Sequence, residues 1–434
     1  MFTLKNNRGM SKNLFVMNPK KELLIRALDG KGEVLNLLGR YDEAIDSFQK
    51  VLKYSKNSHL TLAKSKRKIA DVYQNQDKYE TALKTISDSQ RFLFGDSVEE
   101  QLERVEIYLL RCWIYRIRGE MERAIKEGEM GLRMVDEISP AAIPEQIEIE
   151  HKRIKANGFN SLGAIFWTKG EYDKALELYQ KYLRISEELG DRQGIGKASN
   201  NLGTVYSDKG EYDKAIELFR KYLRISEEIG DKRGIGIASF HLGGLFLELG
   251  ELKKAEEHLL VAKKVLTEIG DKFFLIDAFT EIAELKIKQN FIIEALKYAD
   301  NAFKLAQELG SKHDKARALL MQARIFYQGL LRGIKGDRGL SGVGADTRWH
   351  IADMKFKEAI KIFEELKQPF EIAKAYYYYG EMLKSETLKQ VQGDSGRKGG
   401  KKKANEYLQK AREIFEKIGA KGWLKRVNEL LERI

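Results

Sequence analysis

The chain has 434 residues, of which 43% are hydrophobic and 33% charged, so it can build a core and is not a disordered chain. Its formal net charge is +12, and the surplus lies mainly from Met321 to Ile434, where 24 basic residues outnumber 15 acidic ones. A nucleic-acid groove needs a continuous basic stripe, and the middle of the chain is close to neutral. We therefore do not expect a nucleic-acid partner.

Cysteine content and hydropathy indicate the compartment. A single cysteine, Cys112, excludes an intramolecular disulfide framework and a cysteine-based zinc site. The polar and basic segment Met1 to Lys20 has no apolar stretch of signal-peptide length, and no run of about 18 apolar residues follows. These observations predict a soluble cytoplasmic protein that does not bind a membrane.

Catalytic and cofactor signatures are absent from the sequence. It contains no phosphate-binding loop, no H-E-x-x-H and no C-x-x-C motif, and its six histidines do not show ligand spacing. We therefore assign no catalytic residue, no cofactor and no metal site. The chain is not expected to be an enzyme or to bind a small-molecule substrate.

Two central segments, Asn160 to Asp191 and Asn200 to Asp231, are nearly identical at an offset of 40 residues. The offset extends to neighbouring segments through small residues at Gly163, Gly203, Gly243 and Ala283, and through turn residues at Gly170, Gly210, Gly250 and Asn290. It therefore defines a structural repeat rather than a chance similarity.

Each position of the repeat has a physical reason. In the second segment, Gly203 lies on a first helix whose small residue allows close approach, and Gly210 ends that helix in a left-handed cap. A second helix follows with Ala215 at the crossing point. Gly230 ends the second helix, and Asp231 can cap the next one. Each repeat is therefore predicted to be an antiparallel helix pair.

This pattern resembles the tetratricopeptide repeat, in a 40-residue variant in which Gly-Asp replaces the closing proline. It is similar to the repeats of spindle-orientation adaptors and to the tail arrays of bacterial signalling ATPases, nucleotide cyclases and transcription activators. The segment AREIFEKIGAKGWLKRV, Ala411 to Val427, is most similar to the bacterial tails. The resemblance implies an all-α fold, a right-handed superhelical solenoid of about nine antiparallel helix pairs with a capping helix.

In chain order, weaker copies of the repeat extend the array both ways, with turns expected near Gly39, Asp77 and Gly119 and, later, near Met354 and Gly399. A glycine-rich insertion and a basic insertion interrupt the period, and the basic residues Arg397, Lys398 and Lys401 to Lys403 are interpreted as a solvated loop. The expected organisation is a flexible N-terminus (1–20), repeats one to three (21–150), repeats four to seven with the start of eight (151–328), the glycine-rich insertion (329–350), repeats eight and nine (351–385), the basic insertion (386–403), and the last repeat helix with a capping helix (404–434).

The resemblance also implies that the first helix of each pair lines a concave groove. The predicted partner-binding residues are Asn157, Asn160, Lys197, Asn200, Asn201, Thr204, Asp208, Phe240 and His241. An asparagine amide both donates and accepts, so a row of them can hold an extended peptide, although Asn201 could equally well only solvate the groove. His241 is either a neutral wall residue or a ligand contact. The groove is predicted to be basic at the second repeat, through Lys64, Arg67 and Lys68, and acidic at the seventh.

Two functions remain open at this stage. The first is a protein–protein interaction scaffold or adaptor that binds a peptide or helix of a partner protein in its groove. The second is a regulatory or sensor array of a signalling ATPase, cyclase or transcription-activator system. The similarity of the C-terminal segment favours the second, and the absence of an effector domain in this sequence favours the first.

Overall fold

The computed structural model describes residues 19–433 apart from 77, 332–343, 367, 390–396 and 419. Within these residues every regular element is a helix and no strand occurs, which confirms the predicted all-α fold. The chain divides into two compact units, Met1–Ile154 (the N-terminal unit) and Lys155–Ile434 (the C-terminal unit), which are described separately. No helix of the described residues is long and apolar enough to cross a membrane.

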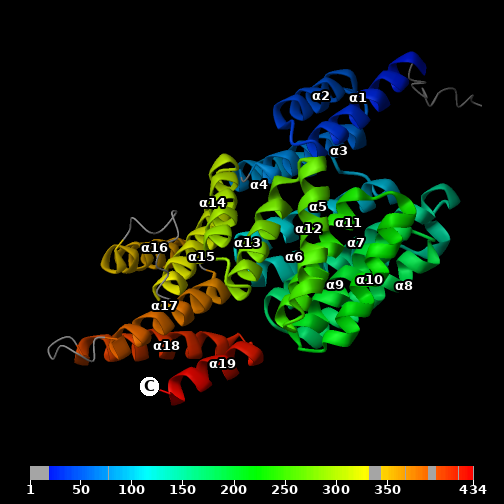
Figure 1. The fold of residues 1–434 in the computed structure, drawn as a ribbon. Helices are drawn as coiled ribbons and strands as arrows, with labels where there is room; N and C mark the ends of the chain where they lie inside the picture. Colours follow the sequence, from blue (N-terminus) through cyan, green and yellow to red (C-terminus); the bar gives the residue numbers. More distant parts are fainter. Residues whose placement is uncertain are drawn as a thin grey trace, which may run out of the picture. The chain divides into compact units, whose positions relative to one another are not determined.

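The N-terminal unit contains three helix pairs, followed by a short 3-10 helix and the first part of α7 (Figure 1). Its elements are α1 (Pro19–Leu37), α2 (Tyr41–Tyr54), α3 (His59–Asn75), α4 (Tyr79–Gln90), α5 (Val98–Ile117), α6 (Met121–Glu137), η1 (Pro140–Ala142) and α7 (Glu145–Thr168).

The C-terminal unit continues from α7 through the regular repeats to the end of the chain (Figure 1). Its further helices are α8 (Tyr172–Glu188), α9 (Arg192–Asp208), α10 (Tyr212–Ile229), α11 (Lys232–Glu248), α12 (Leu252–Ile269), α13 (Lys272–Lys288), α14 (Ile292–Glu308), α15 (Lys312–Leu331), α16 (Ala345–Glu365), α17 (Pro369–Lys389), α18 (Arg397–Lys417) and α19 (Lys421–Glu432). Each odd-numbered helix up to α17 pairs with the even-numbered helix that follows it, α7 and α8 meeting where Gly163 faces the Tyr179 ring. Helix α19 packs on α18 as the expected capping helix.

The helix ends predicted for the second central segment are confirmed, whereas the turn predicted near Asp77 lies outside the described residues. Gly210 has a φ of +79°, and Gly230 ends α10 with a φ of +69°. The Asp231 carboxylate then accepts a hydrogen bond of 3.0 Å from the Gly234 amide and caps α11. Asn290 takes the place of glycine at one turn with a φ of +71°, because asparagine tolerates the left-handed region better than most residues.

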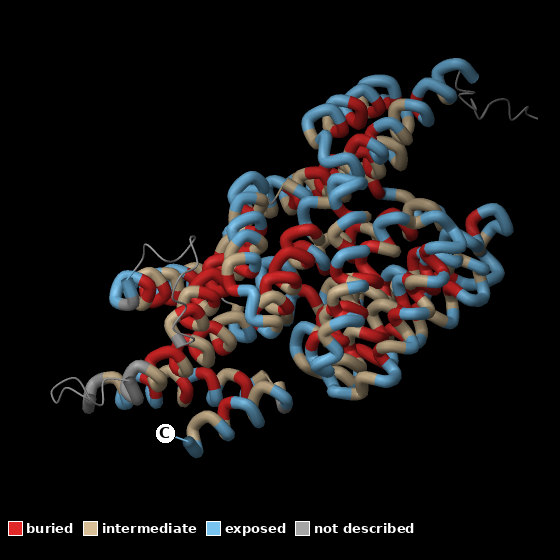
Figure 2. The backbone as a smooth tube through the Cα atoms, viewed as in Figure 1, coloured by how far each residue is buried: buried red, intermediate tan, exposed pale blue. Residues whose placement is uncertain are grey.

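The two helices of a pair meet through small residues. A methyl group at Gly203 would lie 2.8 Å from the Phe219 ring, and Ala215 is completely buried on the opposing helix. Buried and exposed residues alternate along most helices (Figure 2), as expected of helices that pack on one face. The core of the C-terminal unit is thus a continuous series of clusters between stacked helices.

Two predicted turns are wrong. Met354 lies within α16, which begins at Ala345, and α18 already begins at Arg397, ahead of Gly399. The repeat match at Phe356 identified a packed position of the helix but not its start, since Trp349 also packs on the core about two turns earlier. The ends of both expected insertions are therefore helical, including Lys401 to Lys403, while 332–343 and 390–396 lie outside the described residues.

Candidate ligand-binding groove

The three predicted groove asparagines lie together on α7 and α9 and form a short chain of hydrogen bonds. The Nδ2 of Asn201 donates to the Oδ1 of Asn160 at 2.7 Å, and the Nδ2 of Asn200 donates to the Oδ1 of Asn201 at 3.3 Å. The Asn200 Oδ1 is buried and has no hydrogen-bond partner among the described residues. The asparagine row (Asn160, Asn200 and Asn201) thus has one unsatisfied acceptor, which a ligand amide could reach once the Asn200 side chain rotates.

The remaining groove residues of α7 and α9 behave differently from one another. The Thr204 hydroxyl donates to the Asn200 carbonyl of its own helix at 3.0 Å, and the Asp208 carboxylate accepts from the Trp167 indole at 2.6 Å. Asn157 and Lys197 are exposed. The structure therefore brings Asp208 into contact with a neighbouring repeat and leaves Asn157 and Lys197 in solvent.

Phe240 and His241 form an aromatic wall on α11. The His241 imidazole stacks on the Phe219 ring with centroids 4.8 Å apart and planes 6° from parallel, and Phe240 lies 5.1 Å from His241. Burial lowers the pKa of His241 to about 4, so the imidazole is neutral at pH 7. His241 therefore carries no charge into the groove at neutral pH, both as a wall residue and as a ligand contact.

A row of ion pairs crosses from α13 to α15 and was not identified in the sequence. The Arg317 guanidinium pairs with Asp277, and Arg324 pairs with Glu284 at 2.7 Å and lies 3.8 Å over the Tyr378 ring. Both arginines follow their carboxylates by 40 residues, so opposite charges at the repeat offset were the signal that could have found them.

The basic character predicted for the second repeat is wrong, because its cations are neutralised within the N-terminal unit. Lys68 pairs with Asp29 at 2.6 Å, and Arg67 pairs with the buried Glu103 at 2.7 Å. Lys64 lies 4.0 Å from Glu150. The acidic partners lie on other helices, so the first-helix residues alone did not reveal the balance of charge.

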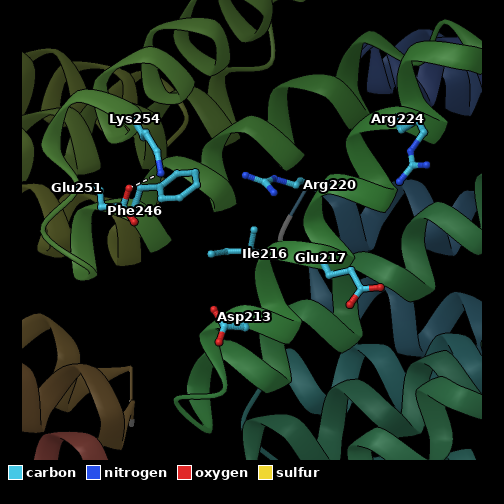
Figure 3. A pocket seen from close by; sticks show the side chains of 8 residues that line it. All are labelled: Asp213, Ile216, Glu217, Arg220, Arg224, Phe246, Glu251 and Lys254. Atoms are coloured by element: carbon cyan, nitrogen blue, oxygen red, sulfur yellow. Dashed lines mark ion pairs between the residues drawn. The ribbon is translucent and has the colours of Figure 1, made fainter.

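A shallow pocket lies on α10, α11 and the start of α12 (Figure 3) and contains none of the predicted site residues. It is lined by Asp213, Ile216, Glu217, Arg220, Arg224, Phe246, Glu251 and Lys254. Lys254 and Glu251 form an ion pair of 2.5 Å, and the remaining charges are of both signs. This mixed lining does not select a ligand of one charge.

The described residues hold no cluster of metal ligands, and their single thiol is buried. In the part of the chain that is described, no three His, Cys, Asp or Glu side chains are grouped as they would be around a metal ion. Cys112 is fully buried, and burial raises the pKa of its thiol to about 12. The side chain therefore fills space in the core instead of acting as a nucleophile.

Comparison with known proteins identifies the repeat. The family model of the tetratricopeptide repeat matches residues 25–58, and a second model of the same repeat matches 154–228 and 194–268. A search of curated proteins finds no match.

Several solved structures share the fold. A Rap protein complexed with competence and sporulation factor has a TM-score of 0.61 at 11% identity, over 93% of this chain and 99% of that one. Aspartyl phosphate phosphatase F from Bacillus subtilis has a TM-score of 0.52 at 14% identity, over 80% and 85%. A signal transduction ATPase from Pyrococcus horikoshii with a tetratricopeptide-repeat sensor has a TM-score of 0.56 at 19% identity, over 81% of this chain but 52% of that one. The helix pairs at 25–58 and 154–268 are therefore tetratricopeptide repeats, in a chain with the fold of other tetratricopeptide-repeat proteins.

Proposed function

We propose that the chain is a protein-interaction scaffold that binds a peptide or helix of a partner protein on the first helices of its C-terminal unit. The observation that carries this proposal is the asparagine row, with its free buried acceptor at Asn200 Oδ1. A peptide backbone offers amide donors and carbonyl acceptors in alternation, which matches the hydrogen bonding of asparagine side chains. We propose the residues Asn157, Asn160, Lys197, Asn200, Asn201, Thr204, Asp208, Phe240 and His241 as the site.

The solved structures of similar fold support a role in regulation. One of them holds competence and sporulation factor, and another carries a tetratricopeptide-repeat sensor. The alternative is therefore that the chain is a regulatory or sensor array, which binds its ligand in the same groove and acts on a separate signalling effector. We propose that the chain is not an enzyme, and that it acts in the cytoplasm, where its single buried thiol stays reduced.

Phosphatase activity is the competing function, because a structure of similar fold is named as an aspartyl phosphate phosphatase. Release of phosphate from an aspartyl-phosphorylated protein would demonstrate it. Our proposal predicts no release above the uncatalysed rate.

The double substitution Asn200→Ala, Asn201→Ala tests the site. Each hydrogen bond lost to a ligand costs about 0.5–1.5 kcal/mol, so partner binding should weaken several-fold or more. The melting temperature should stay unchanged or rise slightly, because alanine is a better helix former than asparagine and offsets the lost bond to Asn160. A partner is first isolated by pull-down and then titrated calorimetrically against both forms.

The exposed pair Glu187→Ala, Glu188→Ala on α8 serves as a matched control, because it removes two polar side chains from a second helix. Equal partner affinities for the asparagine variant and the native chain would place the binding surface elsewhere.

A further inference from the structure

Helix α13 presents three carboxylates on one face, at Asp277, Glu281 and Glu284, which are four and three residues apart. The outer two are paired with Arg317 and Arg324 of α15. Glu281, between them, forms no ion pair or hydrogen bond with any residue that the structure describes. The repeat explains the difference, since the residue 40 positions after Glu281 is the buried Met321 instead of an arginine.

The Glu281 carboxylate points to a gap on the neighbouring first helix. A Cβ added at Gly244 of α11 would meet only this carboxylate, 3.9 Å from Oε2, and no other atom within 4 Å. Gly244 is the α11 counterpart of Glu284, so a side chain is missing where the next repeat has one. The result is a notch, the Glu281 notch, bounded by Glu281 and Gly244.

The surroundings leave this carboxylate uncompensated. Burial, and next the charge of Glu284, raise the pKa of Glu281 to about 7. Lys374 and Arg317 lower it by smaller amounts, and Glu248 raises it slightly. Each of these three side chains already has another partner. Arg317 pairs with Asp277, and Lys374 lies 3.9 Å from Glu371. Glu248 pairs with Arg426 at 2.7 Å. The nearby cations are therefore shared with other carboxylates.

We propose that the Glu281 notch binds a cationic side chain, the guanidinium of an arginine or the ammonium of a lysine, from the peptide held by the asparagine row. The proposal rests on the proposed function, which supplies the peptide. A guanidinium can form two hydrogen bonds with one carboxylate, and a bound cation offsets the desolvation that disfavours the charged form of Glu281. The missing side chain at Gly244 leaves room for that group.

A peptide library tests the notch directly. Random hexapeptides that include arginine, lysine and citrulline are selected on the full-length chain, and the recovered sequences are compared for the native protein, Glu281→Gln and the exposed control Glu227→Gln. Citrulline has the shape of arginine without its charge. We expect one position enriched in arginine or lysine with the native chain and the control, and no such enrichment with Glu281→Gln.

The best peptide and its citrulline analogue are then titrated. Hydrogen bonds to charged groups are among the stronger ones, so we expect citrulline to weaken binding to the native chain about tenfold or more, and to Glu281→Gln by about twofold or less. Gly244→Lys, which places an ammonium group in the notch, should abolish the preference while its melting temperature shows that it remains folded.

The outcomes separate the two proposals. Recovery of no hexapeptide by the native chain would overturn peptide binding at this groove, and the notch with it. Two results would overturn only the proposal for the Glu281 notch. One is recovery of peptides without a position enriched in arginine or lysine. The other is an equal loss of affinity on citrulline substitution for the native and Glu281→Gln chains.

Discussion

At the scale of single residues, Glu281 connects folding stability to pH. Its pKa rises from an ordinary value of 4.5 to about 7 on folding, because burial and Glu284 disfavour the charged form. The folded state therefore binds this proton more tightly than the unfolded state does. Stability from this group is present below the unfolded pKa and is lost as the pH rises through about 7.

We therefore predict that Glu281→Gln stabilises the chain at pH 8. The neutral amide avoids the buried charge, so the free energy of unfolding should rise by about 1–3 kcal/mol at pH 8. The gain should disappear near pH 4, where both states of the native chain are protonated. Urea unfolding at the two pH values measures this difference, and a gain of the same size at both would contradict the assignment. The exposed Glu227→Gln should show no such pH-dependent gain.

At the scale of helices, the crossing of α9 and α10 depends on small residues. Ala215 has no exposed surface and packs in the same cluster as Phe219 and Leu242. A tryptophan there must displace these neighbours, because a filled core has no space for an indole.

We predict that Ala215→Trp lowers the free energy of unfolding by about 1–3 kcal/mol or more. Thermal denaturation followed by circular dichroism measures the change. Glu217→Trp, on the exposed face of the same helix, should leave the melting temperature nearly unchanged. Similar effects at both positions would show that α10 is packed on a different face.

The helix pairs were predictable wherever the turn chemistry is local. Gly210 and Asp231 act on residues within one turn of themselves, so the sequence alone indicated their roles, and the structure agrees. The start of α16 was not predictable. The repeat match at Phe356 marks a residue that packs in the core, and the helical residues before it follow no repeat pattern. Arg324 was not predicted, because its partner Glu284 lies one repeat earlier and pairing between repeats leaves no mark in the small and turn residues that define the period.

At the scale of the C-terminal unit, the end of the chain contacts helices far from it in sequence. Arg426 of α19 pairs with Glu248 of α11, 178 residues earlier, and the Ile418 carbonyl lies directly against Gly170. A 40-residue period relates only neighbouring repeats. Contacts at this distance arise from small rotations added over many repeats, and the sequence does not specify those rotations.

Alanine substitutions at two glycines with the same backbone conformation distinguish the stability contributed by the contact at Ile418 from the backbone strain of the turn itself. Gly170 and Gly210 have φ values of +75° and +79°, so alanine should cost about 1–2 kcal/mol at either position for backbone strain alone. A Cβ at Gly210 would meet no atom within 4 Å, whereas one at Gly170 would collide with the Ile418 carbonyl oxygen. We therefore predict that Gly170→Ala lowers the free energy of unfolding by about 1–3 kcal/mol more than Gly210→Ala, because the backbone at Ile418 must move. Urea denaturation of both variants measures the difference. Equal losses would mean that the C-terminal segment does not rest on the α7–α8 turn in solution.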